Sequence, residues 1–307
     1  MSELTEVTAG LKFPEGPIAM ADGSVILVEM FGPRLTRVLP DGTKETVAEV
    51  PGGPNGAAMG PDGAIYVCNN GGRFTEMALE GLCFPGPVTP EKYIGGRIQR
   101  VDIASGEVTD VYTEFDGNKF WAPNDLVFDD QGGFYFTDHG LSHERDAHLT
   151  GIYYGKADGS MVKEIVFPAH EPNGIGLSPD GTKLYWAETW TGRIMQRDIL
   201  GPGELAEASI VDTSVCLYGF PGFQLLDSLA VDADGNVVVA TLVNGGITSV
   251  SPKGELVDFV PTGDLLTTNV CFGGDDLKTA YITLSGTGRL MKAAWPRAGA
   301  KLNYLNT

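Results

Sequence analysis

The sequence lacks the segments that take a chain into or across a membrane. No apolar run approaches the roughly 18 residues that a membrane helix needs. Residues 1–10 have neither the basic region nor the apolar region of a secretory signal. We therefore expect a cytoplasmic protein without a membrane partner.

Basic residues are also scarce. The chain has 21 Lys and Arg residues against 40 Asp and Glu residues, which gives a net charge of −19, and no basic stripe is present. A surface of this sign repels phosphate backbones and anionic lipids, which excludes nucleic acid as a partner. We interpret the acidity as a contribution to solubility and expect a monomer or a small homo-oligomer.

Cysteines are few as well. The four, Cys68, Cys83, Cys216 and Cys271, show no CxxC spacing and no density typical of a disulfide framework. This fits reduced thiols in a cytoplasm. The spacing alone leaves a Cys68–Cys83 bridge open.

What the sequence does contain is a repeat punctuated by 42 glycines and 19 prolines. Each unit joins an apolar segment, a turn that is often Asp-Gly, and an alternating strand. Asp-Gly between such segments predicts a two-residue hairpin of type I′, which needs positive φ at both central positions. The first strands and turns of the six units cover residues 13–29, 54–69, 122–138, 171–188, 225–241 and 267–283.

Six such units predict an all-β fold, a six-bladed β-propeller that forms a single domain over residues 1–307. Four-stranded units cannot bury their faces singly, so they close radially around a channel. Residues 5–11 are expected to supply the outer strand of the last blade. Two long loops, 70–95 and 138–150, are expected at the mouth where the first strands begin, and long loops in such places are often lids.

Polar residues occupy equivalent positions at the start of the first strands. Because these positions converge near the axis, unpaired groups there would cost about 1–3 kcal/mol each. A set of carboxylate and amide oxygens suits Ca²⁺, Mg²⁺ or Mn²⁺ better than zinc, and predicts one divalent metal ion at this mouth of the central channel. The six residues are Glu15, Asn55, Asn124, Asn173, Asp227 and Asn269.

A simpler interpretation is that these residues only form turns, since Asn before Gly is common in turns. It fits Asn55 and Asn173. The turn interpretation does not account as well for Glu15, which stands between Pro14 and Gly16. Nor does it account for Asp227, which lies within the apolar stretch LLDSLA. These two residues favour a site.

Histidines and aromatic residues complete the set of candidates. His139, His143 and His148 share one loop and could hold zinc, but the loop has no cysteine, and we interpret them as lid residues in solvent. Several aromatic residues fall in rim segments, and core packing explains about half of them. The candidates for substrate binding are Asn55, Trp121, His139, Trp190 and Phe220.

Four segments resemble the gluconolactonase-like superfamily, which includes senescence marker protein (regucalcin) and a drug-responsive lactonase branch. They are FPEGP (13–17) and residues 122–138, 171–189 and 226–240, and FYFTDHG resembles the drug-responsive branch. The resemblance covers almost the whole chain and implies a six-bladed propeller with a catalytic divalent cation, commonly Ca²⁺. It also implies the metal ligands, which are Glu15, Asn124, Asn173 and Asp227.

The resemblance implies a metal-dependent lactonase that opens the ester bond of a small lactone. Asp227 would act as general base or nucleophile, and Asn124 would stabilise the oxyanion. Direct ligation lowers the pKa of a carboxylate and makes it a poorer base, so His139 and His170 remain alternative bases.

One position departs from the family pattern. The sugar-lactonase branch has an Arg two residues before the first Asn, where this chain has Ala122. The exchange removes a hydrogen-bonding fork and favours a less hydroxylated lactone. The alternatives are a phosphotriesterase of the diisopropyl fluorophosphatase type and a non-catalytic ligand-binding propeller. For the cation, Mg²⁺, Mn²⁺ and Zn²⁺ are the alternatives to Ca²⁺.

Overall fold

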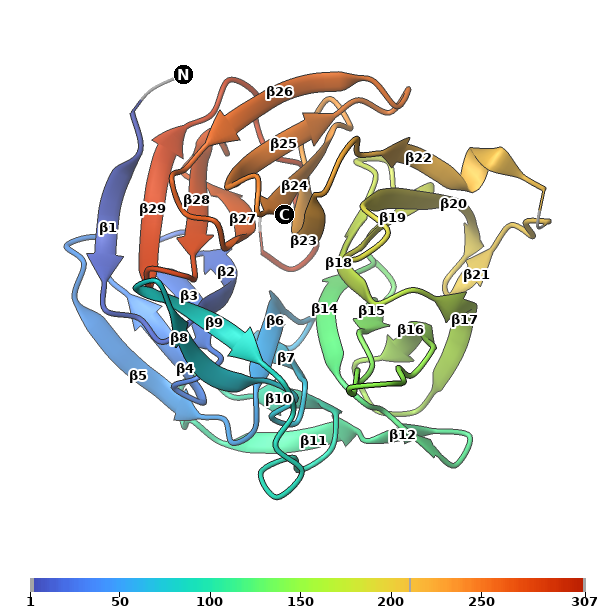
Figure 1. The fold of residues 1–307 in the computed structure, drawn as a ribbon, viewed down its shortest axis with the longest axis horizontal. Helices are drawn as coiled ribbons and strands as arrows, with labels where there is room; N and C mark the ends of the chain where they lie inside the picture. Colours follow the sequence, from blue (N-terminus) through green and yellow to red (C-terminus); the bar gives the residue numbers. More distant parts are fainter. Residues whose placement is uncertain (1–2, 210, 306–307) are drawn as a thin grey trace.

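The computed structural model describes residues 3–209 and 211–305, and these form six antiparallel blades around a central axis (Figure 1). Within each blade the strands lie side by side, and the order given below runs from the innermost strand to the outermost. Blade 1 contains β2 (Pro14–Ala19), β3 (Val25–Glu29), β4 (Arg34–Val38) and β5 (Lys44–Glu49). Blade 2 contains β6 (Pro54–Met59), β7 (Ile65–Asn69), β10 (Arg97–Val101) and β11 (Val108–Tyr112). Blade 3 contains β14 (Pro123–Phe128), β15 (Gly133–Asp138), β16 (Thr150–Lys156) and β17 (Val162–Ala169).

The second half of the chain repeats this arrangement. Blade 4 contains β18 (Pro172–Leu177), β19 (Lys183–Glu188), β20 (Arg193–Gly201) and β22 (Cys216–Gly219), with a short β21 (Glu204–Leu205) and the 3₁₀ turn Thr213–Val215. Blade 5 contains β23 (Leu225–Val231), β24 (Val237–Leu242), β25 (Gly246–Val250) and β26 (Leu256–Pro261). Blade 6 contains β27 (Thr267–Gly273), β28 (Thr279–Leu284), β29 (Arg289–Ala294) and β1 (Thr5–Ala9).

The blades close into a ring through two devices. The inner strands touch in the cyclic order β2, β6, β14, β18, β23, β27 and back to β2. The first strand of the chain, β1, pairs with β29 and completes blade 6. The six-bladed propeller predicted from the repeats is therefore confirmed, as is the outer strand predicted within residues 5–11.

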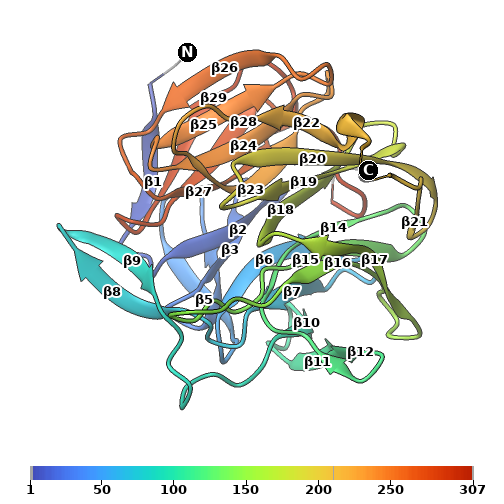
Figure 2. The same ribbon diagram turned by 45° about the vertical axis from the view of Figure 1, so that its right-hand side comes forward.

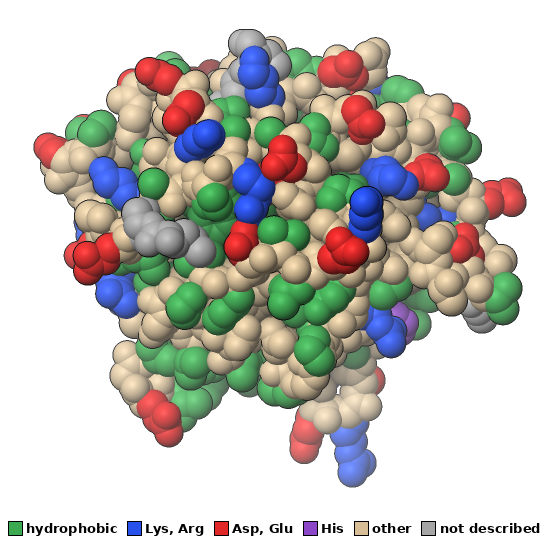
Figure 3. Space-filling view, turned by 90° about the horizontal axis from the view of Figure 1, so that it is seen from above, with side chains coloured by type: hydrophobic (Ala, Val, Ile, Leu, Met, Phe, Trp, Pro, Cys, Tyr) green, Lys and Arg blue, Asp and Glu red, His purple; other side chains and the backbone are tan. Residues whose placement is uncertain are grey.

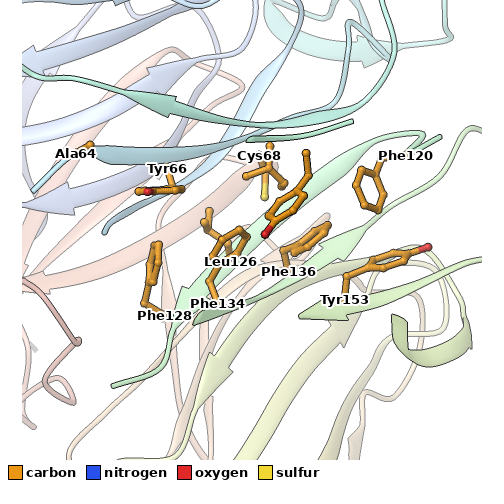
Figure 4. Packing of buried hydrophobic residues seen from close by; sticks show 11 residues of the cluster. Ala64, Tyr66, Cys68, Phe120, Leu126, Phe128, Phe134, Phe136 and Tyr153 are labelled. Carbon is orange, nitrogen blue, oxygen red and sulfur yellow. The ribbon is translucent and has the colours of Figure 1, made fainter. Parts of the chain in front are cut away.

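Among the described residues the core consists of seven apolar clusters, and six of them lie between two neighbouring blades. Figure 4 shows the cluster between blades 2 and 3, where Tyr66 and Cys68 face Phe128, Phe134 and Phe136. Because both faces of a blade are covered, a strand such as β3 is buried along its whole length. Each large side chain buried in this way contributes about 1.5–3 kcal/mol.

The hairpin turns differ from the type I′ turns predicted for Asp-Gly. In the turn between β2 and β3, which covers residues 20–24, only Gly23 has positive φ, while Asp22 accepts a hydrogen bond from the Ser24 amide at 3.0 Å. Met20 N–H donates to Ser24 O, so the loop is longer than two residues. The hydrogen bond to the Asp22 side chain keeps the backbone of Asp22 at negative φ, so that only the glycine is left-handed. This pattern matches a type I turn followed by a glycine bulge.

The two mouths of the channel have different surroundings. We call the mouth where the inner strands begin the site mouth, and the opposite one the far mouth. The segment 299–305 crosses the far mouth, where Asn303 Nδ2 donates to Phe128 O and Tyr304 Oη accepts from Gly132 N. Between the two mouths lies a cavity of about 600 Å³, lined by Asp125 and Asn269 at the end nearest the site.

The surface carries both signs of charge. Figure 3 shows acidic and basic side chains interspersed over the side of the molecule that it presents. Within the described residues there is no helix with the length and hydrophobicity of a membrane span.

Candidate functional site

The six polar residues lie where the inner strands leave regular pairing. In every blade the register between the first and second strands shifts at the start of the inner strand, for example between Glu15 and Ile18, and between Leu226 and Leu229. Such bulges bend a strand and redirect a side chain. The same irregularity repeated six times therefore gives the six polar residues equivalent positions around the axis.

Glycines let the inner strands approach closely at this level. A Cβ on Gly56 would lie 2.6 Å from Asn124 O, and one on Gly174 would lie 2.4 Å from Leu229 N. Both contacts are to backbone, which cannot move aside without shifting a neighbouring blade. This explains why Gly follows the polar residue in the PEG and PNG segments.

All six polar side chains are buried. Asn269 Nδ2 donates to Glu15 Oε2 at 3.3 Å, and Asn173 Nδ2 donates to Thr189 Oγ1 at 3.2 Å. Asn55 lies in β6 at the equivalent position. The exposed fractions are Glu15 2%, Asn55 6%, Asn124 3%, Asn173 5%, Asp227 9% and Asn269 5%.

The electrostatics of this cluster favour a cation. Burial, and then the charge of Asp227, raises the pKa of Glu15 well above its usual value. Burial is also the main cause that raises the pKa of Asp227 to about 7, with a further contribution from Asp125. Two carboxylates that repel each other in a buried place are stabilised by a positive partner.

The amide oxygens point to the same partner. Asn124 Oδ1 and Asn173 Oδ1 are buried, and neither accepts a hydrogen bond from the described residues. Oxygen ligands of this kind fit a hard divalent cation. Over residues 3–209 and 211–305 no group of three or more His, Cys, Asp and Glu side chains could hold a metal, so a site here requires the amides as well as the two carboxylates.

Sequence reasoning missed Asp125. This carboxyl is buried beside Asn124, its pKa is raised to about 7 mainly by burial, and its Oδ1 accepts a hydrogen bond from the Leu126 amide at 2.9 Å. Asp125 and Ser228 take the position that Gly56 and Gly174 hold in other blades. That break in the glycine pattern was the signal that could have identified them.

The other predicted residues surround this cluster at different depths. Trp121 and Trp190 are partly exposed at 37% and 61%, and Phe220 is half-buried with its N–H donating to Gly192 O. The expectation that His139 lies in solvent is wrong: its ring packs against Phe74, and its Nε2 lies 3.5 Å from Glu171 Oε2. Burial lowers the pKa of His139 to about 3, which makes it a weak base, and His170 is exposed.

Asp138 fixes the segment that leads into Asn124. Its carboxylate is buried and accepts hydrogen bonds from the amides of Trp121, Ala122 and Gly140 at 2.7–3.0 Å. An Asp138→Ala exchange would leave three amides without their acceptor. We expect it to lower the free energy of unfolding by about 3 kcal/mol, measured by urea denaturation. A change below about 0.5 kcal/mol, the range of ordinary surface substitutions, would show that these bonds do not hold the segment.

The expected loop at 70–95 is partly a hairpin, formed by β8 (Thr75–Leu79) and β9 (Leu82–Gly86). We call residues 70–95 the insertion. Figure 2 shows the hairpin projecting from the ring. Its Cys83 N–H donates to Gly286 O of blade 6, and Cys83 is a free thiol, so a Cys68–Cys83 bridge is absent. A second small hairpin, β12 (Glu114–Phe115) with β13 (Asn118–Lys119), precedes blade 3.

Comparison with known proteins finds lactonases among the relatives of this chain. A family model described as SMP-30/Gluconolactonase/LRE-like region matches residues 13–286. Over 94% of its length the chain is 29% identical to lactonase drp35 of Staphylococcus epidermidis, and 83% of that protein is covered. It is 26% identical to a gluconolactonase of Zymomonas mobilis, with 91% of this chain and 78% of the relative covered.

Solved structures show the same fold. A gluconolactonase from Xanthomonas campestris aligns with a TM-score of 0.76 at 21% identity, covering 96% of this chain and 90% of that one. A structure from Agrobacterium tumefaciens described as the calcium-binding protein regucalcin aligns with a TM-score of 0.74 at 18% identity, covering 100% and 97%. At these identities the likeness concerns the fold.

Proposed function

Since this chain belongs to the SMP-30/gluconolactonase/LRE-like family, we propose that it is a divalent-cation-dependent lactonase, with Ca²⁺ as the first candidate ion. The observation that carries the proposal is the buried set of two carboxylates and two amide oxygens that accept no hydrogen bond from the described residues. Glu15, Asn124, Asn173 and Asp227 would hold the ion. A bound divalent cation would supply Lewis-acid polarisation of the lactone carbonyl.

The chain's own residues supply the remaining chemistry. The NH₂ groups of Asn124 and Asn173 can donate hydrogen bonds to the oxyanion that develops when the ester is attacked. Asp227 is proposed to take the proton of the attacking water, because burial raises its pKa and so offsets the lowering that contact with the cation would cause. Asp125, beside Asn124, adds negative charge that raises the pKa of Asp227.

The surroundings of the cluster support a lactone with few hydroxyl groups. Trp190 follows Thr189, whose hydroxyl accepts from Asn173, and it is 61% exposed. Trp121 precedes Ala122 in the segment that leads to Asn124 and stacks on His148 at a centroid distance of 4.0 Å. These side chains offer apolar area at the site mouth, where a sugar lactone would need hydrogen-bonding partners.

A substrate panel tests this proposal. Purified protein loaded with Ca²⁺ should open alkyl-substituted and aromatic lactones with kcat/KM at least about tenfold higher than for an aldonolactone, which corresponds to about 1.4 kcal/mol. The assay follows acid release by pH-stat. Preference for a fluorophosphate would favour a phosphotriesterase. Turnover of no substrate by protein that binds the cation would favour a non-catalytic propeller.

A further inference from the structure

A buried arginine connects three segments at the site mouth. Arg73 of the insertion is only 6% exposed. Its Nε donates to Gly140 O at 2.6 Å, and its Nη2 donates to Ser142 Oγ at 3.2 Å and lies 3.9 Å from Glu171 Oε1. Arginine is almost never buried without partners. The three contacts therefore fasten the insertion to the 138–150 loop and to the start of blade 4.

Glu171 has a strained backbone conformation. It is a non-glycine residue with a φ of 48°, and a left-handed conformation of this kind costs about 1 kcal/mol. The Ser142 hydroxyl donates to its Oε1, and Thr189 N–H donates to its backbone oxygen. Pro172 and the proposed ligand Asn173 follow directly. The partner of Arg73 thus stands where the chain enters β18.

The rest of the insertion is fastened to other blades. The guanidinium of Arg73 lies 4.3 Å from the centre of the Phe74 ring, and Phe74 packs with Phe13, Met30 and Leu266. At the other end of the insertion, Tyr93 Oη donates to Trp121 O at 2.5 Å. The insertion therefore spans from blade 3 towards blades 1 and 6, whereas Trp190 and Phe223 of blade 4 and its exit loop stay exposed.

We propose that Arg73 is a positioning residue: through its buried pair with Glu171 it holds the insertion as a fixed wall of the substrate pocket and sets the preference for lactones with a bulky apolar substituent. This inference rests on the proposed lactonase function. A wall fixed before binding loses little conformational entropy when a substituent packs on it, so it strengthens binding of lactones that reach it and leaves compact lactones unaffected.

Three variants separate this role from simple stability. Arg73→Met leaves the largely buried Glu171 carboxylate without its cationic partner and should destabilise the fold. Arg73→Met/Glu171→Gln removes both charges, so it should recover stability while the wall stays unfastened. Arg73→Lys keeps the charge but loses the planar set of guanidinium donors. It should therefore retain only part of the attachment of the insertion. Arg100→Met is the matched control, because Arg100 is partly exposed and pairs with the exposed Asp62 in blade 2.

The kinetic test compares γ-butyrolactone with a γ-lactone that carries a long alkyl chain. In the double variant we expect KM for the alkyl lactone to rise about tenfold, equivalent to about 1.4 kcal/mol, while its kcat and both constants for γ-butyrolactone stay within about twofold. Ca²⁺ affinity should not change. An unchanged KM, or an equal loss for both lactones, would overturn the proposal.

A second readout does not depend on activity. Amide hydrogen exchange in residues 71–95 should be slow in the wild-type protein and at least about tenfold faster in the double variant, because the local opening no longer breaks a buried pair. Equal exchange in the two proteins would overturn the proposal. Failure of the wild-type protein to open either lactone would instead refute the proposed function, and hydrogen exchange would still decide whether Arg73 fastens the insertion.

Discussion

Replacement of Asp227 by Asn is expected to lower kcat/KM for lactone opening by at least about 10³-fold, within the range for loss of a general base. The side chains have almost the same size, so the packing of β23 should survive. The exchange removes one of the two carboxylates that would hold the cation, and the affinity for Ca²⁺ should fall with the activity. Isothermal titration calorimetry and the lactone assay measure the two effects on the same sample.

A matched variant in the same blade serves as the control for Asp227→Asn. Asp234 is an exposed carboxylate in the turn between β23 and β24, and Asp234→Asn makes the same chemical change away from the site. It should leave activity and Ca²⁺ binding unchanged. If Asp227→Asn behaved like Asp234→Asn, the site would have to lie elsewhere.

Replacement of Gly174 by Ala should strongly destabilise the fold and lower activity as well. The new Cβ would lie 2.4 Å from Leu229 N and 2.6 Å from the Cα of Ser228, both in the inner strand of blade 5. The backbone must shift to relieve this overlap, which costs about 3 kcal/mol. Because Asp227 precedes Ser228, the shift should also lower kcat/KM by about 100-fold, since small misplacements of reacting groups are costly.

The control for this variant is Gly219→Ala. A Cβ at Gly219 would meet no heavy atom within 4 Å, and its backbone is not left-handed. Its free energy of unfolding should stay within about 0.5 kcal/mol of the wild-type value. Urea denaturation of the two variants compares them directly. Equal stabilities would show that the inner strands tolerate more space than their packing suggests.

The parts of this fold that repeat could be predicted, because a repeat turns distant residues into equivalent ones. Glu15 and Asn269 are 254 positions apart, and a hydrogen bond still joins their side chains. Their place at the start of two equivalent strands predicted that they meet near the axis. The same argument gave the closure of the ring by the first strand, which pairs with β29.

The features that occur once could not be predicted in the same way. Among residues 3–209 and 211–305 the contact between Arg73 and Glu171 has no counterpart in other blades, so no periodicity indicates it. The hairpin β8–β9 was expected only as a loop because its strands pair with each other and not with a blade. Asp125 was overlooked because the adjacent Asn124 already explained the motif, although its burial beside Ser228 makes it part of the site.

The central claim is that a divalent cation at Glu15, Asn124, Asn173 and Asp227 is required for lactone opening. The most direct test is the activity of the wild-type protein before and after treatment with a chelator, followed by addition of Ca²⁺. The account predicts that activity falls at least about 100-fold on removal of the ion, because Lewis-acid activation is lost, and returns as one Ca²⁺ binds per chain. Lactone opening that continues at its original rate in protein shown to be metal-free would contradict it.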